Sequence, residues 1–380
     1  MALRIIITGD FCLNGQTVLF CEEKKYDEIY GDALSILRTK DLSITNLESP
    51  LTNSNSQIDK TGPSIKSSPD CIDLIQYGGF DVACLANNHI LDYGATGLDD
   101  TLLACSSVNI KTVGAGSNLN AASKPLFIDS CDTKVAIVNI AENEFSIAGD
   151  QSPGANPLDP VNNYYQILDA KKKASVVVVI IHGGNEYNSL PSPMQVKIYR
   201  FFAELGATVI IGHHPHCYSG YEIYKGVPIF YSLGNFIFNP GNIKPDPWYE
   251  GFFVRLEIDE GAVRKYEIFP YFQCKGKPGL KLMREIDEER FNERIFKLSQ
   301  IIQNDSELTD HWIRFCHKQE KYYLPALLGL NKVTKRLQGI KSLRRLIINK
   351  RRLLKLRNVI TCEAHRNACL QVIDNLLSMP

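Results

Sequence analysis

The sequence predicts a large α/β domain with mixed β-sheets and flanking helices, followed by a helical C-terminal segment. Up to about residue 215, short apolar stretches alternate with amphipathic helical ones, which is typical of a largely parallel, helix-covered sheet. A hairpin and two further strands follow, so the sheet system should be mixed. After residue 281 the pattern turns helical and stays helical to the end.

The predicted strands are rich in Val and Ile, and most end next to Gly, Asp, Asn or His. In chain order they cover residues 3–9, 41–46, 80–86, 134–140, 175–181 and 207–211. Helical periodicity between them predicts helices at 33–38, 98–105 and 194–205. A hairpin is expected where Lys225-Gly226 separates residues 221–224 from 227–232, and strands near 252–258 and 264–270 complete the domain. Lys275-Gly276-Lys277-Pro278-Gly279 then interrupts the pattern, which predicts domains at 1–280 and 281–380.

Composition narrows the class of protein. The 380 residues are 44% hydrophobic and 22% charged, as in ordinary globular proteins, and no stretch is apolar enough for a membrane span. The N-terminus reads as the first strand rather than as a signal peptide or anchor. Eleven cysteines without a C-x-x-C pair favour reduced thiols. We therefore expect a cytoplasmic protein.

A histidine cluster, Gly212-His213-His214-Pro215-His216, follows the last strand of the alternating region directly. It holds three of the eight histidines of the chain. Imidazoles so close together would repel one another if they were charged, whereas neutral imidazoles can gather around a cation. The cluster therefore predicts a metal site at the carboxyl end of a strand.

Other strands end in similar residues. Ligands of open α/β sheets bind at the carboxyl ends of the strands, where these side chains should meet. In chain order, the first strand is followed by Asp10, the second by Asn46 and Glu48, and the third by Asn87 to His89 with Asp92. The fourth is followed by Asn139 with Glu142, and the fifth by His182. Taken singly, Asp10 could be a turn former, Asn88 a helix cap and His182 a hydrogen-bonded core residue. Taken together, they favour a shared metal site.

The nitrogen and oxygen ligands suit Mn²⁺, Fe²⁺ or Zn²⁺ better than a soft metal. Asp10 or Glu48 could bridge two ions, an arrangement that stabilises the attacking and leaving oxygens of a phosphoryl transfer. A further histidine would then supply a proton to the leaving oxygen. The residues alone leave open whether one ion or two are bound.

Several blocks resemble the bacterial CapA family of capsule-synthesis proteins, which includes proteins of poly-γ-glutamate capsule production. The resemblance extends from residue 5 to about 272 and rests on Gly9-Asp10, NLESPLT at 46–52, NNHILDYG at 87–94, GANPLD at 154–159, HGGNEY at 182–187 and GHHPHCYSGYEIYKGVPIFYSLGNFIF at 212–238. The family fold is similar to that of calcineurin-like metallophosphoesterases. The resemblance thus implies a metallophosphatase-like mixed β-sheet sandwich flanked by helices, with a C-terminal helical appendage.

The resemblance also implies residue roles. The implied metal ligands are Asp10, Glu48, Asn88, His182, His214 and His216. The implied catalytic residues are His89, which also lies at the metal centre, and His213 and Asp92, which support it or act in acid–base chemistry. Asn235 would close the site from beyond the hairpin.

This chain departs from the pattern of the resembling proteins at four places. Metallophosphoesterases usually carry Asp-x-His at the first strand, whereas this chain has Asp10-Phe11-Cys12, which removes one ligand of one ion. Glu48 stands where that superfamily has a bridging Asp, and His182-Gly183-Gly184 replaces the common His-Trp-Gly. Many relatives look anchored in a membrane at the N-terminus, whereas this chain starts in its first strand.

The C-terminal region is strongly basic. From Lys321 onward there are thirteen Lys and Arg against two acidic residues, so the rest of this neutral chain is acidic. Residues 331–360 hold eleven of these cations and no acid, with apolar residues near helical spacing. Such a helix could lie on the inner face of an anionic membrane, bind an acidic partner or capsular polymer, or pack on the acidic body of its own chain. Nucleic acid is disfavoured, because aromatic residues are sparse there.

The sequence therefore predicts a metal-dependent hydrolase of phosphoesters or phosphodiesters in capsule or exopolysaccharide biosynthesis. Its partners would be an anionic phosphorylated or polymeric substrate and the capsule synthesis machinery. Two alternatives stay open. One is a non-catalytic, metal-stabilised subunit of a polymer synthesis or export complex. The other is a hydrolase of a glycosidic or γ-glutamyl amide bond.

Overall fold

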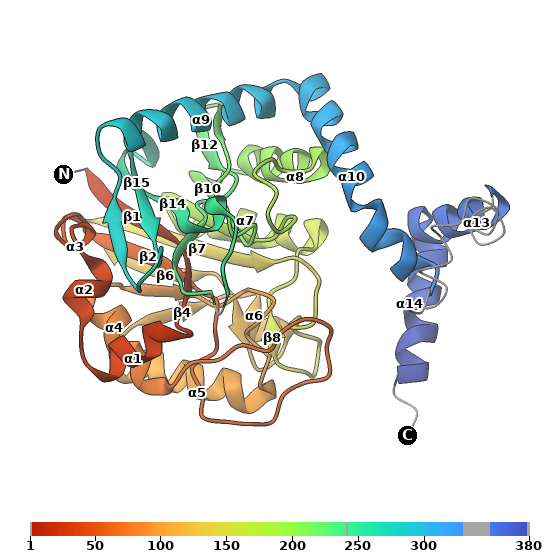
Figure 1. The fold of residues 1–380 in the computed structure, drawn as a ribbon, viewed down its shortest axis with the longest axis horizontal. Helices are drawn as coiled ribbons and strands as arrows, with labels where there is room; N and C mark the ends of the chain where they lie inside the picture. The colour runs from red at the N-terminus through yellow and green to blue at the C-terminus, as the bar shows by residue number, and fades with distance from the viewer. Residues whose placement is uncertain (1, 241, 330–349, 378–380) are drawn as a thin grey trace. The chain divides into compact units, whose positions relative to one another are not determined.

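The computed structural model describes residues 2–240, 242–329 and 350–377 (Figure 1). Contacts divide the chain into two compact units, residues 1–310 and 311–380. All strands of the described residues lie in the first unit. The change from strands to helices predicted near residue 280 occurs after the last strand, which ends at Leu282.

The first sheet has eight strands in the order β16-β15-β14-β1-β2-β3-β4, and β13 also pairs with β1. The pairs among β1, β2, β3 and β4 are parallel, as is the β1–β13 pair, whereas β14 to β16 are antiparallel to their neighbours. The strands are β1 (Leu3–Cys12), β2 (Leu42–Leu47), β3 (Val82–Cys84), β4 (Lys111–Val113), β13 (Asn235–Phe238), β14 (Glu250–Asp259), β15 (Ala262–Gln273) and β16 (Leu280–Leu282).

The second sheet has six strands in the order β11-β12-β10-β9-β7-β6. They are β6 (Leu126–Ser130), β7 (Thr133–Ala141), β9 (Val176–His182), β10 (Val209–His213), β11 (Tyr221–Tyr224) and β12 (Val227–Phe230). The predicted hairpin is present, and Lys225 and Gly226 both have positive φ, as a tight two-residue turn requires. Two short strands, β5 (Ala115–Gly116) and β8 (Gly154–Ala155), pair separately.

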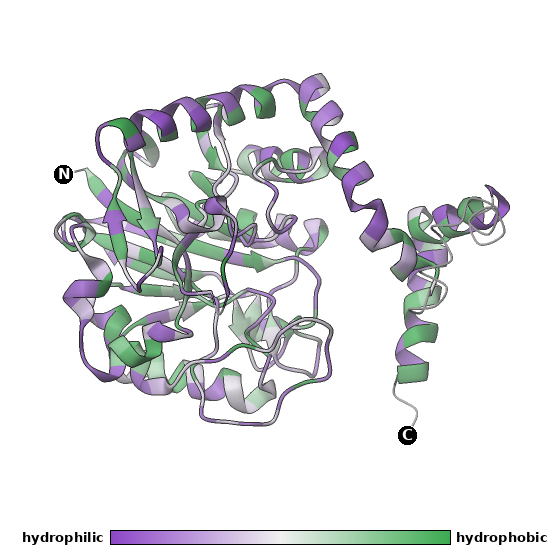
Figure 2. Ribbon diagram, viewed as in Figure 1, coloured by the Kyte–Doolittle hydropathy of each residue, from purple (hydrophilic) through white to green (hydrophobic). Residues whose placement is uncertain are grey.

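Helices cover the outer faces of the two sheets, and α9 (Ile286–Gln303) packs against the core between them. In the first unit they are α1 (Gln16–Glu22), α2 (Tyr26–Tyr30), α3 (Ala33–Leu37), α4 (Ile72–Tyr77), α5 (Gly94–Ser107), α6 (Leu119–Ala122), α7 (Pro160–Lys173), α8 (Pro193–Glu204) and α9 (Ile286–Gln303), with 3₁₀ turns η1 (Pro69–Cys71) and η2 (Asp246–Tyr249). α10 (Asp305–Leu327) follows, and α13 (Lys350–Thr361) and α14 (Glu363–Leu377) lie in the second unit. In Figure 2 the strands are mostly hydrophobic and the helices are striped.

The sheets pack face to face, because alternate strand residues fill separate cores. Val178 and Ile180 of β9 pack against residues such as Ile5 and Ile7 of β1, between the sheets. The intervening residues of β9, such as Val179, pack against α7 and α8. Burial on both faces explains why this strand is an unbroken apolar run. The predicted mixed sandwich with flanking helices is confirmed.

Among the described residues, no helix combines the length and the apolar content that a bilayer span requires. Part of the predicted basic helix, residues 331–349, lies outside the described residues. Its remainder forms α13.

Candidate metal centre

The inner faces of the two sheets bring polar strand ends together. Asn46 continues the inward row of Leu42 and Ile44 on β2, and His182 continues that of Val178 and Ile180 on β9. By the same alternation His213, at the end of β10, points toward the first sheet. The site therefore forms where the carboxyl ends of strands from both sheets meet.

Asp10 does not follow simple alternation. Counting from Ile6 would place it on the helix-covered face, but the β1–β2 register shifts between Ile7 and Asp10. Such an irregularity re-aims the side chain that follows it. The Asp10 carboxylate is fully buried and accepts hydrogen bonds from Asn46 Nδ2 (2.8 Å) and from the backbone N–H of His214 (3.1 Å).

Two glycines let the backbones approach closely enough to form the site. A Cβ on Gly9 would lie 2.0 Å from the carbonyl oxygen of Gly234, and one on Gly212 would lie 2.1 Å from that of Tyr231. Each glycine precedes a site residue, Asp10 or His213. No larger side chain fits at these positions without moving a strand.

Histidines surround Asp10. The Nδ1 atom of His213 lies 3.1 Å from Asp10 Oδ1, but their arrangement does not make a regular hydrogen bond. His182 Nδ1 lies 3.9 Å from Oδ1, and His216 Nδ1 lies 3.8 Å from Oδ2. Burial alone would raise the pKa of Asp10, but the adjacent histidines, with His213 first, outweigh it and hold the pKa below its usual range.

Glu48 differs from Asp10, because both of its carboxylate oxygens are buried without a hydrogen-bond partner among the described residues. Its Oε1 atom lies 3.6 Å from His216 Nε2 and 4.0 Å from His89 Nε2. Burial, followed by the nearby charge of Asp10, raises the pKa of Glu48 well above its ordinary value. An unpaired buried carboxylate is expensive unless something else binds it.

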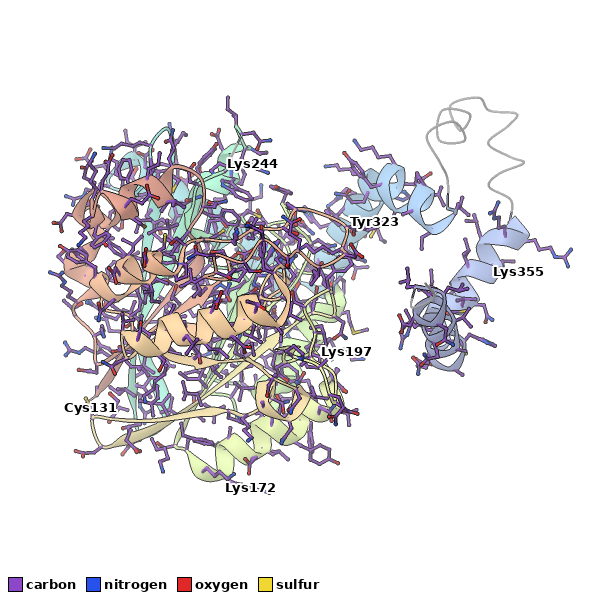
Figure 3. The ribbon with its side chains drawn as sticks, turned by 90° about the horizontal axis from the view of Figure 1, so that it is seen from below. Cys131, Lys172, Lys197, Lys244, Tyr323 and Lys355 are labelled. Carbon is purple, nitrogen blue, oxygen red and sulfur yellow. The ribbon has the colours of Figure 1, made fainter. Side chains whose placement is uncertain are left out.

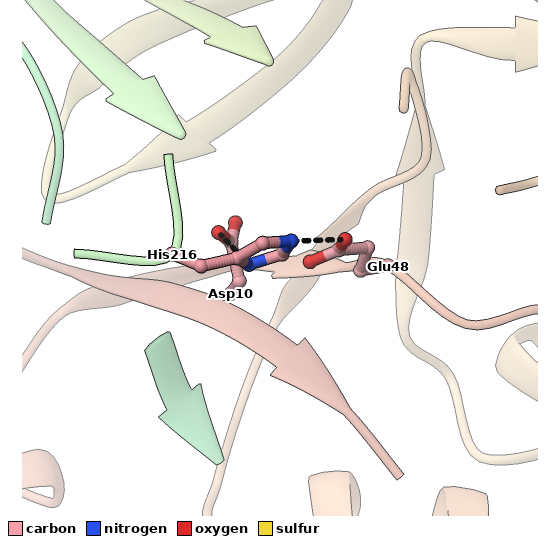
Figure 4. A group of neighbouring side chains, drawn as sticks. All are labelled: Asp10, Glu48 and His216. Carbon is pink, nitrogen blue, oxygen red and sulfur yellow. Dashed lines mark ion pairs between the residues drawn. The ribbon is translucent and has the colours of Figure 1, made fainter. Parts of the chain in front are cut away.

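Asp10, Glu48 and His216 form a candidate metal site (Figure 4). One ligand atom from each lies within 4.8 Å of the other two. Asn46 Oδ1 and both ring nitrogens of His213 are also buried without a regular hydrogen-bond partner. These oxygen and nitrogen donors fit a divalent ion of the Mn²⁺, Fe²⁺ or Zn²⁺ kind.

A second group of ligand atoms lies beside the first. His182 Nε2 is 3.1 Å from both Asn88 Oδ1 and His214 Nδ1. Burial, followed by the proximity of His214, lowers the pKa of His182 well below its ordinary value, and burial lowers the pKa of His216 to about 3. These imidazoles are neutral at physiological pH, which is the form that binds metals.

His214 and His216 adopt backbone conformations that are rare outside glycine, with φ of 95° and 55°. Each such residue carries roughly 1–3 kcal/mol of strain. The loop after β10 thus turns successive histidines toward one point. His216 is further held by Asn235 Oδ1 (2.9 Å from Nδ1) and by the Trp248 ring, whose centroid is 4.8 Å away.

The predicted catalytic residues lie in different places. His89 Nδ1 is 2.7 Å from Asp92 Oδ2, while its Nε2 faces Glu48. Asp92 is fully buried and also pairs with Lys60, whose side chain is only 4% exposed. His213 lies beneath Asp10 with a fully buried side chain, so it is far less accessible than His89.

A cleft of about 510 Å³ adjoins the candidate metal site at His216. Asn88, His89 and His216 line it, together with residues that sequence reasoning did not identify. These include Lys60, Lys244, Glu144, Glu186, Tyr187 and Trp248. They come from irregular loops and η2, where no periodic pattern marks a side chain as inward-facing.

Two strand-end residues have structural partners instead. Asn139 Oδ1 accepts from the N–H of Ala86 (2.7 Å), and Glu142 Oε2 accepts from the N–H of Gly184 (3.0 Å).

Cys12 stands where the family resemblance leads us to expect a histidine, at the end of the first strand. Burial, followed by the nearby Glu48, raises the pKa of this thiol well above its usual value, which disfavours the thiolate that a metal would bind.

Comparison with known proteins establishes the family. The family model described as "Bacterial capsule synthesis protein PGA_cap" matches residues 4–240, so the chain belongs to this family. The PGA biosynthesis protein CapA of Bacillus subtilis is 32% identical over 274 residues, which cover 70% of this chain and 71% of that protein. The capsule biosynthesis protein CapA of Bacillus anthracis is 31% identical over 248 residues, covering 63% and 60% of the two chains.

Other matches are more distant. A probable polyglutamine synthesis accessory protein of Mycobacterium tuberculosis is 29% identical over 223 residues, covering 55% of this chain and 59% of that protein. Among solved structures, a hypothetical protein from Thermus thermophilus has a TM-score of 0.47 at 13% identity, over 71% of this chain and 99% of that one. A 5′-nucleotidase from Candida albicans has a TM-score of 0.42 at 10% identity, over 84% and 58%.

Proposed function

We propose that this member of the capsule synthesis family is a metal-dependent hydrolase of the phosphoester or phosphodiester type. It would act in capsule or exopolysaccharide biosynthesis and use one or two Mn²⁺, Fe²⁺ or Zn²⁺ ions. The observation that carries the proposal is Glu48, a buried carboxylate without a partner beside Asp10 and His216. A cation at this point would satisfy it.

The ligands suggest where the ions would bind. Asp10, Glu48 and His216 would hold one ion, and Asn88, His182 and His214 would hold a second if two are bound. When bound, such an ion lowers the pKa of water and polarises an ester oxygen.

The protein itself would manage the proton. Asp92 fixes His89 Nδ1, which leaves Nε2 directed toward Glu48 and the cleft. This orientation suits a general acid that gives a proton to the leaving oxygen. Lys60 contacts both residues, since it pairs with Asp92 and its Nζ lies 3.3 Å from His89 Nδ1, so it would help to hold the orientation of His89.

The cleft suits an anionic phosphorylated substrate, such as a lipid-linked or sugar phosphate. Lys60 and Lys244 line it beside Glu144 and Glu186, so its own charges nearly balance. With cations bound below, the site would attract phosphate oxygens. Polymer synthesis machinery is the expected partner, since relatives are named for PGA biosynthesis and capsule biosynthesis.

The test begins with elemental analysis of the full chain purified without chelator, followed by a screen of phosphomonoesters and phosphodiesters with added Mn²⁺. We expect bound metal and measurable turnover. His89→Ala should lower the rate by about 10²–10⁴-fold with metal content retained. His317→Ala, an exposed histidine of α10, is the matched control and should leave both unchanged.

The second candidate is a metal-stabilised subunit without catalytic activity. The missing Asp-x-His ligand at Cys12 and the accessory role in the name of the mycobacterial relative favour it. Bound metal without any turnover, together with co-purification of a synthase, would establish this role and exclude the hydrolase. Release of free glutamate or new reducing ends from polymer would instead identify an amide or glycosidic bond as the target. Absence of metal even after reloading would exclude a metal enzyme.

A further inference from the structure

The C-terminal helices α13 and α14 contact each other but bury none of their side chains completely. Several large apolar residues are exposed on both. Figure 2 shows hydrophobic and hydrophilic residues alternating along these helices. Folded chains seldom leave so many apolar side chains in water unless they contact something else. Both helices belong to the second compact unit, and the catalytic proposal makes no use of them.

The charged and apolar residues of α13 are arranged around a common face. Leu353 and Ile360 are 39% and 45% exposed, and at 100° per residue they lie within 20° of each other. Arg352 flanks this face on one side and Arg357 on the other. With Lys350, Arg351 and Lys355, the helix carries five cations and no acidic residue; Figure 3 labels Lys355.

The neighbouring helix α14 adds apolar surface. Leu370, Ile373 and Leu377 follow helical spacing and are 53%, 50% and 80% exposed. Leu376 is 60% exposed on an adjacent side of the helix, about 100° from Leu377. The two helices in contact therefore expose leucine and isoleucine side chains, and α13 adds five cations.

We propose that the α13–α14 hairpin binds the surface of an anionic phospholipid bilayer. Lipid headgroups would neutralise the cations, and the interface beneath them would take up the apolar side chains. Arginines that flank an apolar face can extend their guanidinium groups to the phosphates while their stems stay in the interface. An acidic polymer or an acidic protein surface would pair with the cations but leave Leu370 and Ile373 in water.

This contact would be peripheral, because none of the described helices can span a bilayer. It would bring the protein to the membrane surface whatever reaction the metal centre performs.

The experiment is co-sedimentation of the full chain with vesicles. One set contains equal parts of phosphatidylglycerol and phosphatidylcholine, and the other contains phosphatidylcholine alone. Two variants test the two halves of the proposal, Lys350→Glu with Arg357→Glu beside the apolar face of α13, and Leu370→Ser with Ile373→Ser. The matched controls on the body are Lys171→Glu with Lys172→Glu on α7, and Leu103→Ser on α5, all at exposed positions. Circular dichroism confirms that each variant is folded.

We expect the native chain to bind the anionic vesicles and not the neutral ones. Each C-terminal double variant should weaken binding at least tenfold, and the controls should not change it. Absence of binding to anionic vesicles would overturn the proposal, as expected if the helices pack on protein. Binding that the charge variant abolishes but the apolar variant leaves intact would also overturn it, and would indicate a site for a soluble polyanion such as polyglutamate.

Discussion

Two buried glutamates of this protein have opposite surroundings. Glu222 on β11 is 5% exposed, and its carboxylate accepts hydrogen bonds from Arg200 Nε and Nη2 (both 2.9 Å) and from the Tyr231 hydroxyl (2.6 Å). Glu48 is fully buried and has no hydrogen-bond partner in the described part of the chain. Both residues were removed from water on folding, but only Glu222 was given partners by its own chain.

The difference separates a structural carboxylate from a candidate ligand. The hydrogen bond to Glu222 raises the pKa of Arg200 above its ordinary value, so the pair stabilises its own charges. For Glu48 the main effect is burial, which raises its pKa and opposes its charge. A buried carboxylate without a hydrogen-bond partner, such as that of Glu48, calls for an explanation, and a bound cation would supply the missing partner.

The largest expected effect is on metal binding. Glu48→Gln keeps the shape but removes the charge, and metal affinity should fall by about a hundredfold or more, because a direct ligand matters at least as much as its supporting residues. Glu222→Gln should leave affinity unchanged. Titration with Mn²⁺ or Zn²⁺ followed by calorimetry compares the two, and equal affinity for Glu48→Gln and the native chain would contradict the assignment.

The next largest effect is on stability at the other glutamate. Arg200→Ala leaves Glu222 buried with only Tyr231 as partner, and breaking such a pair typically costs about 3 kcal/mol or more of unfolding free energy. Chemical denaturation in the presence of chelator measures this loss. An unfolding free energy close to that of the native chain would show that water replaces the arginine.

A smaller effect of opposite sign is expected for Glu48 without metal. Because burial raises the pKa of Glu48, folding without metal must either desolvate or protonate its carboxylate at neutral pH. Glu48→Gln removes that cost, so the metal-free variant should be more stable by about 1 kcal/mol. Thermal unfolding in chelator should therefore show a higher midpoint, whereas adding metal should reverse the order of the two proteins. A lower midpoint in chelator would mean that the native carboxylate has a partner of its own.

The smallest effect concerns a third glutamate, at the surface, which extends the comparison to a partly exposed pair. The hydrogen bond from Arg255 lowers the pKa of Glu267 in the folded protein. The pair therefore stabilises the fold fully at pH values above the pKa that Glu267 has in the unfolded chain. This stabilisation is lost as the pH falls through the folded-state pKa of Glu267. The advantage of the native chain over Glu267→Gln should be only about 0.5 kcal/mol near neutral pH. It should shrink once the pH falls below the ordinary glutamate pKa and vanish once both carboxyl states are protonated, as a series of denaturation curves at decreasing pH would show.

The sequence located part of the site because strand ends are visible in it. Asp10, His182 and His214 each follow or end an apolar run, and parallel strands bring such ends together. Lys60 was not predicted, because it lies in an irregular loop and reaches Asp92 only through the folded loop path. Neither periodicity nor composition marks such a residue.

The fold shows the same limit. Runs such as Val176 to Ile181 identify strands, but they are apolar on both faces and so do not reveal which sheet a strand joins. β13 escaped prediction because it is a four-residue strand that follows Gly234 and pairs with β1, far away in sequence. The register shift before Asp10 occurs where β1 pairs with β2, about 36 residues away in sequence, and no residue pattern marks it.

The order in which the site assembles follows from its origin in two sheets. Asp10 and His216 stand at opposite ends of the alternating region, so the oxygen and nitrogen ligands meet only after both sheets have formed and packed. Before that stage the histidine cluster alone would prefer Cu²⁺ or Ni²⁺ to Mn²⁺. If the proposed site binds an ion, its choice of ion is therefore a property of the finished fold, and we expect a chain that meets excess copper before its sheets close to bind the wrong metal.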